Sequence, residues 1–193
     1  MDATIKLLIG LANPGAEYAR TRHNAGGWFV ERVAEDHHAT LRNESKLKAS
    51  FCKIPNIPPL MLAVPSVYMN QSGETVKALL NFYKLSPKEI LIAHDDIDLG
   101  VGQIKIKETG GHGGHNGLRD IFKHIGTQDF WRLRIGVGHP GNKNLVTNYV
   151  LKPPSISDRK AIDEVIDQAA MVLPDILSGD MQKAMQQLHT SGE

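Results

Sequence analysis

Short apolar runs alternate along the chain with longer stretches in which apolar residues recur every three or four positions. The short runs predict strands and the longer stretches predict helices. The predicted strands are residues 5–10, two segments within 49–64, and residues 90–93, 103–107 and 131–137. The predicted helices are residues 24–37, 72–83, 117–126, 157–177 and 180–188. Strands that alternate with helices predict an α/β fold, with a mixed, largely parallel twisted sheet flanked by helices.

Turn and capping residues set the expected limits of several elements. Asn24 could cap the first helix through its side chain, and Gly126 suits the C-terminal end of the third. Pro55–Pro59 predicts a turn between two strands, and Pro174 a bend or break in the fourth helix. Residues 142–152 read as a loop or a short helix.

Length and composition restrict the class of protein. The 193 residues, with no repeat and no long linker, predict a single domain over 1–193. The chain is 41% apolar, no apolar run approaches the length of a membrane span, and the N-terminus lacks the pattern of a signal peptide. Cys52 is the single cysteine and cannot form an internal disulfide. We therefore expect a reduced, cytoplasmic protein.

The net charge of +1 hides an uneven distribution of charge. Residues 101–152 carry eight basic and three acidic side chains, an excess of five, whereas residues 153–193 carry three basic and seven acidic ones. A local basic excess can form a patch that faces phosphate groups. A charged face exposed to water explains the same pattern, so both interpretations stay open.

Three polar clusters, at residues 11–24, 94–98 and 109–117, follow predicted strands or turns. Ligands of α/β sheets bind beyond the carboxyl ends of the strands, so we expect these clusters to converge on one cleft. The third cluster is rich in glycine and leads into a helix N-terminus, a position that favours anions. It matches no nucleotide-binding motif, so no cofactor is expected, and a mobile surface loop is the alternative.

His23 is the first candidate for chemistry, because a histidine is the usual general base at neutral pH. Asp95 follows an apolar strand and could orient the imidazole, which would then activate water, since no G-x-S-x-G serine motif is present. Most of the nine histidines should be surface residues or satisfied hydrogen-bonding groups, and a solvated acidic turn also explains Asp95.

A metal site is a competing interpretation of the same region, since His94, Asp95, His112 and His115 are residue types that bind divalent ions. No H-E-x-x-H motif occurs, and one cysteine excludes a thiolate cage, so no metal is expected. Asn70 could be a residue that only begins a helix, or its amide could bind a peptide backbone.

Six blocks, taken together and in this order, resemble the bacterial-type peptidyl-tRNA hydrolases. The blocks are residues 10–15, 21–26, 68–73, 94–99, 111–117 and 132–141. The resemblance implies a monomeric enzyme, without cofactor, metal or obligate protein partner, that hydrolyses the ester between a peptide and the 3′-terminal ribose of tRNA. Its use would be to recycle tRNA from prematurely released peptidyl-tRNA. Two positions depart from the family pattern: Asp96, where glutamate is frequent, and Gly100–Val101, where proline is frequent.

The same resemblance assigns roles to individual residues. His23 matches the catalytic base, Asp95 its orienting carboxylate, and Asn13 the residue that helps to distinguish N-blocked from free aminoacyl groups. Lys107 and Arg134 match the pair that meets the tRNA 5′-phosphate. The remaining substrate contacts would be Tyr18, Tyr68, Met69, Asn70, His115 and Asn116. A non-catalytic RNA-binding relative and a metal-dependent hydrolase are the alternative functions.

Overall fold

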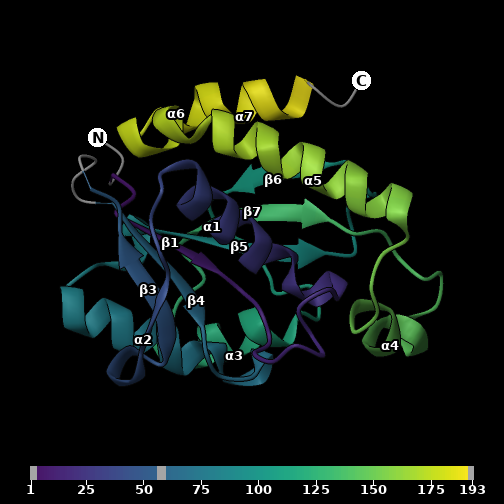
Figure 1. Ribbon diagram of the computed structural model, residues 1–193, viewed down its shortest axis with the longest axis horizontal. Helices are drawn as coiled ribbons and strands as arrows, with labels where there is room; N and C mark the ends of the chain where they lie inside the picture. The colour runs from purple at the N-terminus through teal and green to yellow at the C-terminus, as the bar shows by residue number, and fades with distance from the viewer. Residues whose placement is uncertain (1–3, 56–59, 191–193) are drawn as a thin grey trace.

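A seven-stranded mixed sheet forms the centre of the computed structural model, which describes residues 4–55 and 60–190 (Figure 1). The strands are β1 (Leu7–Gly10), β2 (Arg42–Glu44), β3 (Ala49–Lys53), β4 (Met61–Pro65), β5 (Ile90–Asp96), β6 (Ile104–Lys107) and β7 (Trp131–Gly136). Their order is β2-β3-β4-β1-β5-β7-β6. The four central strands pair in parallel, and β2, β3 and β6 join by antiparallel pairing. The α/β class and the mixed, largely parallel sheet are confirmed.

Helices cover both faces of this sheet (Figure 1). The α-helices are α1 (Ala25–Asp36), α2 (Ser72–Tyr83), α3 (Asn116–Ile125), α4 (Val146–Val150), α5 (Ile156–Met171), α6 (Leu173–Ser178) and α7 (Met181–Thr190). Short 3-10 helices are η1 (Arg22–Asn24), η2 (Ser45–Leu47), η3 (Met69–Gln71), η4 (Pro87–Glu89) and η5 (Lys143–Leu145). Helices α1, α5, α6 and α7 lie on one face, and α2 and α3 lie on the other.

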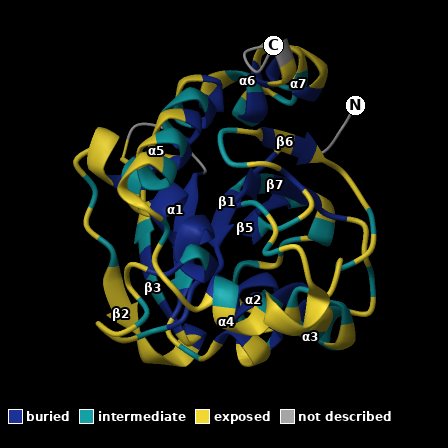
Figure 2. Ribbon diagram, turned by 90° about the vertical axis from the view of Figure 1, so that its right-hand side faces the viewer, coloured by how far each residue is buried: buried dark blue, intermediate teal, exposed yellow. Residues whose placement is uncertain are grey.

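The central strands are buried (Figure 2). They are apolar on both sides because each side faces a separate hydrophobic core. In β1, Leu8 packs into the core beneath α1 and α5, whereas Leu7 and Ile9 pack into the core above α2 and α3. A parallel sheet covered on both faces requires such continuous apolar runs. The polar residues that follow these apolar runs therefore come at the carboxyl ends of the strands.

Two glycines let the start of α1 press against the ends of β1 and β5. A Cβ atom on Gly26 would lie 2.2 Å from the carbonyl oxygen of Ala93, and one on Gly10 would lie 2.2 Å from that of Gly26. The backbone N–H of Leu11 donates to the same Ala93 oxygen at 3.0 Å. Because no side chain separates these segments, the turn before α1, which carries His23, lies next to the residues that follow Ala93.

Several predicted elements match the structure. Helix α2 has the predicted bounds, and α3 ends at Ile125 with Gly126 as its C-cap, whose φ of 71° is the left-handed conformation that suits glycine. The predicted helix over 157–177 is broken, since α5 ends at Met171 and α6 begins at Leu173 with Pro174 in its first turn. Residues 142–152 contain η5 and the short helix α4.

Other expectations were wrong or incomplete. Asn24 does not cap α1 with its side chain, because its amide is bound to the backbone of Asn13 instead. Strand β2 was not predicted, since its three residues are all exposed and show no apolar alternation. Strand β5 runs to Asp96, three residues further than its apolar pattern. The predicted turn at Pro55–Pro59 lies, beyond its first residue, outside the described residues.

Within residues 4–55 and 60–190, no helix is both long enough and apolar enough to cross a bilayer.

Candidate active site

A cleft of about 1050 Å³ opens at the carboxyl ends of the parallel strands. Residues of all three polar clusters, 11–24, 94–98 and 109–117, line it together with residues of η3 and α4. The three clusters therefore converge on one cleft, as predicted. Every site residue expected from the sequence lies on the wall of this cleft: Asn13, Tyr18, His23, Tyr68, Met69, Asn70, Asp95, Lys107, His115, Asn116 and Arg134.

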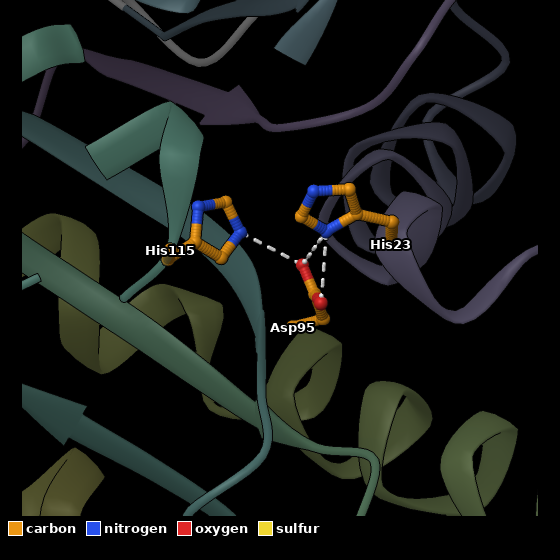
Figure 3. Close-up of side chains that lie close together, drawn as sticks. All are labelled: His23, Asp95 and His115. Atoms are coloured by element: carbon orange, nitrogen blue, oxygen red, sulfur yellow. Dashed lines mark hydrogen bonds and ion pairs between the residues drawn. The ribbon is translucent and has the colours of Figure 1, made fainter. Parts of the chain in front are cut away.

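The buried carboxylate of Asp95 lies between two imidazole rings at one point of the cleft wall (Figure 3). His23 approaches from η1 and places Nδ1 3.0 Å from both carboxylate oxygens. His115 approaches from the residue before α3 and places Nε2 2.8 Å from Oδ1. Since α1 and α3 pack on opposite faces of the sheet, the end of β5 is where these two helix starts can meet.

Hydrogen bonds to the backbone fix the tautomer of His115. Its Nδ1 accepts the N–H groups of Gly117 at 3.1 Å and Leu118 at 3.3 Å, and so caps the first turn of α3. The ring proton must then be on Nε2, which donates to Asp95. His23 likewise donates through Nδ1, and its Nε2 keeps a lone pair in a residue that lines the cleft.

The charge of Asp95 changes the protonation of the site. Burial favours the neutral acid, but the neighbouring His23 and His115 rings outweigh this effect and hold the pKa of Asp95 well below its ordinary range. Burial also lowers the pKa of His23, yet the charge and hydrogen bond of Asp95 raise it by more, to above 6.5. At neutral pH the site therefore contains a carboxylate that makes the His23 ring more basic.

His94 is a third histidine at this point, but its environment keeps it neutral. Burial and the nearby His115 ring lower the pKa of His94 to about 4. Its Nδ1 donates to the backbone oxygen of Asp95 at 2.8 Å, and its buried Nε2 has no hydrogen-bond partner among the described residues. The rings of His94 and His115 lie edge to face, with centroids 5.2 Å apart. His94 therefore packs against His115 as an uncharged residue.

The atoms of His23, Asp95 and His115 lie close enough together, within 4.8 Å, to surround a metal ion. However, the nitrogens next to the carboxylate, Nδ1 of His23 and Nε2 of His115, donate protons to Asp95. His115 could free Nε2 for a metal only by moving its proton to Nδ1, which would break two hydrogen bonds to the start of α3. The arrangement suits proton transfer better than coordination.

Asn13 is held in one orientation at the edge of the cleft. Its Oδ1 accepts the backbone N–H of Met69 at 2.7 Å, so its amide nitrogen is the group left to donate to a ligand. The side chain of Asn24 holds the backbone of Asn13 with two hydrogen bonds, of 2.9 and 3.0 Å. Nearby, Tyr18 and Tyr68 meet edge to face, and Tyr68 is 55% exposed.

Arg132, which we did not predict, shapes the glycine-rich loop. Its buried guanidinium donates to the carbonyl oxygens of Gly111 at 2.7 Å and Gly110 at 2.6 Å, and lies over the rings of Phe122 and Phe130. Burial, together with a nearby arginine, lowers its pKa to about 10, so it is still charged at neutral pH. An arginine in a buried strand was the available signal, because a buried charge needs fixed partners.

Arg22, also not predicted, joins the turn that carries His23 to α4, a helix that contributes residues to the cleft wall. Its Nη1 donates to the carbonyl oxygens of Tyr149 at 2.9 Å and Lys152 at 3.2 Å. The guanidinium carbon lies 3.9 Å from the centre of the Tyr149 ring. The hydroxyl of Tyr149 in turn donates to Val137 at the end of β7. Helix α4 is therefore anchored both to η1 and to the residue that follows β7.

Comparison with known proteins gives a consistent result. A family model described as peptidyl-tRNA hydrolase matches residues 7–193. The chain is 50% identical to the peptidyl-tRNA hydrolase of Coxiella burnetii (strain RSA 331 / Henzerling II), covering 98% of this chain and all of the relative. It is 51% identical to that of Legionella pneumophila (strain Paris), over 96% and 98% of the two chains. The crystal structure of peptidyl-tRNA hydrolase from Acinetobacter baumannii superimposes on this chain with a TM-score of 0.93 and 44% sequence identity. The match covers 97% of this chain and 96% of that structure.

Proposed function

This chain belongs to the peptidyl-tRNA hydrolase family, and on that premise we propose that it cleaves peptidyl-tRNA with His23 as general base. The bond broken is the ester between the peptide and the 3′-terminal ribose, and the products are a free peptide and a reusable tRNA. Because this substrate arises during translation, the enzyme would act in the cytoplasm.

The observation that carries the proposal is the contact between Nδ1 of His23 and the carboxylate of Asp95. A carboxylate that accepts the Nδ1 proton makes the opposite nitrogen of the ring the basic one. The second contact to Asp95, from His115, fixes the carboxylate in a position where it can do so. Such a pair has no evident use in a protein that only binds RNA.

In the proposed reaction, Nε2 of His23 removes a proton from a water molecule as its oxygen attacks the ester carbonyl carbon. The tetrahedral intermediate then collapses, the bond to the ribose oxygen breaks, and the proton held by His23 passes to that oxygen. A positioned general base supplies about 10²- to 10⁴-fold in rate. An ester is more easily cleaved than an amide, so a base with a few hydrogen-bond donors is sufficient.

Substrate contacts follow from the donors and charges of the cleft wall. The amide nitrogen of Asn13 would donate to a carbonyl of the peptide, as would Asn70 and Asn116. Lys107 and Arg134 would meet the 5′-phosphate of the tRNA, since phosphate contacts position an RNA without reading its sequence.

We propose further that the reaction needs no metal ion. Support comes from the tautomers of the site, in which His23 and His115 both donate protons to Asp95 rather than presenting lone pairs to a common point. A bound ion would displace these protons, and Nε2 of His23 would then lose the contact between Nδ1–H and Asp95 that makes it basic.

The test is release of an N-acetyl-aminoacyl group from tRNA in excess chelator, by the wild type and by His23→Ala. His139→Ala is the matched control, because His139 also lines the cleft but, within the described part of the chain, hydrogen bonds only to the backbone of Gly141. We expect rapid release by the wild type and the control, and a loss of about 10²- to 10⁴-fold in His23→Ala. Rapid release by all three proteins would show that a residue other than His23 is the base. Release by none would indicate a metal requirement or a protein that only binds RNA.

A further inference from the structure

The carboxylate of Asp96, next to the proposed catalytic carboxylate, is held at both of its oxygens. Oδ1 accepts the backbone N–H of Asp98 at 2.8 Å, and Oδ2 accepts Nε–H of Arg134 at 2.7 Å. The side chain of Asp96 is 11% exposed and that of Arg134 is 23% exposed. The backbone thus fixes the carboxylate, and the carboxylate fixes the guanidinium.

The way in which Arg134 is held leaves its other donors available. Only Nε hydrogen bonds to Asp96, and neither Nη group has a hydrogen-bond partner among residues 4–55 and 60–190. Arg134 lines the cleft, as does Lys107 on the neighbouring strand β6. The Nη edge of a guanidinium can donate to two oxygens of one phosphate group, provided that the fork points at it.

We infer that Asp96 is a positioning residue for phosphate recognition, which holds Arg134 so that its two Nη groups meet the 5′-terminal phosphate of the RNA. This inference rests on the proposed function, which assigns Arg134 to that phosphate. It concerns binding alone and gives Asp96 no part in ester cleavage.

The inference makes a prediction opposite in sign to that of simple electrostatics. A carboxylate beside a phosphate site repels the ligand, so removal of its charge by itself should tighten binding. If Asp96 instead orients Arg134, the same removal weakens binding, because a long side chain must then be ordered when the ligand binds. The direction of the change separates the two effects.

A carboxylate is needed here because two donors face the side chain from different directions. Asparagine has one acceptor oxygen, so in Asp96→Asn either the Asp98 N–H or the Arg134 Nε–H would face an NH₂ group. Glutamate keeps two acceptor oxygens, so Asp96→Glu can restore both contacts. Asp98→Asn is the matched control, since Asp98 lines the same cleft and joins the arrangement only through its backbone N–H.

The experiment measures the affinity of the full chain for an acceptor-stem RNA helix that carries either a 5′-phosphate or a 5′-hydroxyl. The ratio of the two affinities reports the phosphate contact. We expect Asp96→Asn to reduce the wild-type ratio by about two- to ten-fold. Asp96→Glu should retain most of the ratio, and Asp98→Asn should retain it or increase it. The kcat at saturating substrate should be unchanged in Asp98→Asn.

The two ways to fail are distinguishable. A wild-type ratio near one would remove Arg134 from phosphate recognition, and so would overturn the proposed contact and the inference together. A clear wild-type ratio that Asp96→Asn keeps or increases would overturn the inference alone. An equal reduction in Asp98→Asn would also overturn it, because the loss would then not depend on the contact between Asp96 and Arg134.

Discussion

Replacing Asp95 by asparagine keeps the size of the side chain but exchanges one of its acceptor oxygens for a donor. His115 donates to Oδ1 at 2.8 Å and cannot change tautomer without losing its bonds to Gly117 and Leu118. The single oxygen of the asparagine will therefore face His115. Nδ1 of His23 lies 3.0 Å from both oxygen positions, so the NH₂ group at the second position donates to Nδ1 and puts the ring proton on Nε2.

A proton on Nε2 of His23 removes the lone pair that would accept a proton from water. We expect kcat to fall by about 10⁴-fold, the loss that the same change causes in a Ser-His-Asp triad, or roughly 5 kcal/mol of transition-state stabilisation. Asp95→Ala imposes no tautomer, so part of the His23 population keeps its proton on Nδ1. The alanine variant should therefore lose less, about 10²- to 10³-fold.

The assay is single-turnover release of an N-acetyl-aminoacyl group from tRNA between about pH 6 and pH 9. Since a tautomer preference does not depend on pH, raising the pH should not restore Asp95→Asn. Nitrogen-15 chemical shifts of the His23 ring should show the proton on Nε2. The reasoning is refuted if Asp95→Asn reaches the wild-type rate at any pH in this range, or if it is faster than Asp95→Ala.

Burial lowers the pKa of His23 but its carboxylate partner raises it by more, so kcat/KM should rise with pH through a value above 6.5. The contribution of this pair to the free energy of unfolding has the opposite pH dependence: it is complete below pH 6.5 and is lost as pH rises through the folded-state pKa of His23. A kcat/KM profile whose midpoint lies below pH 6.5 would contradict both expectations. Gly26→Ala puts a Cβ 2.2 Å from a carbonyl oxygen of β5 and should lower the free energy of unfolding by about 1–3 kcal/mol or more. Gly111→Ala is the control, because a Cβ on Gly111 meets no atom within 4 Å. If urea unfolding shows the same loss of stability in both variants, the close packing at Gly26 is not the cause of that loss. Lys107→Ala with Arg134→Ala should flatten the dependence of log K for tRNA on log salt by roughly 1.5, and an unchanged slope would remove both residues from the interface.

Local patterns were enough to predict most of the fold. Helix α2 matches its predicted bounds because its apolar period and its flanking turns are both local properties of the sequence. Strand β2 could not be predicted, since Arg42, Asn43 and Glu44 are exposed and join the sheet only by pairing with β3. A short edge strand of this kind depends on its neighbour and leaves no apolar pattern.

The candidate site was less accessible from the sequence, because its contacts depend on the tertiary structure. Asparagine at position 24 is typical of a helix cap. Only the fold shows that the Asn24 side chain instead hydrogen bonds to the backbone of Asn13. The glycine-rich loop was visible as a motif, but its attachment to Arg132 was not, since that contact requires the loop to return over β7. Likewise, Arg134 reaches Asp96 only through the parallel register of β5 and β7.

The close backbone packing at Gly10, Gly26 and Ala93 has a consequence for how the protein loses activity when heated. His23 and Asp95 sit on segments joined by main-chain contacts, so they cannot separate unless the β1–β5 ladder opens. That ladder lies in the middle of the sheet, where opening amounts to global unfolding. Thermal inactivation and unfolding should therefore share one midpoint, and the amide of Leu11 should exchange its hydrogen as slowly as the most protected residues of the core.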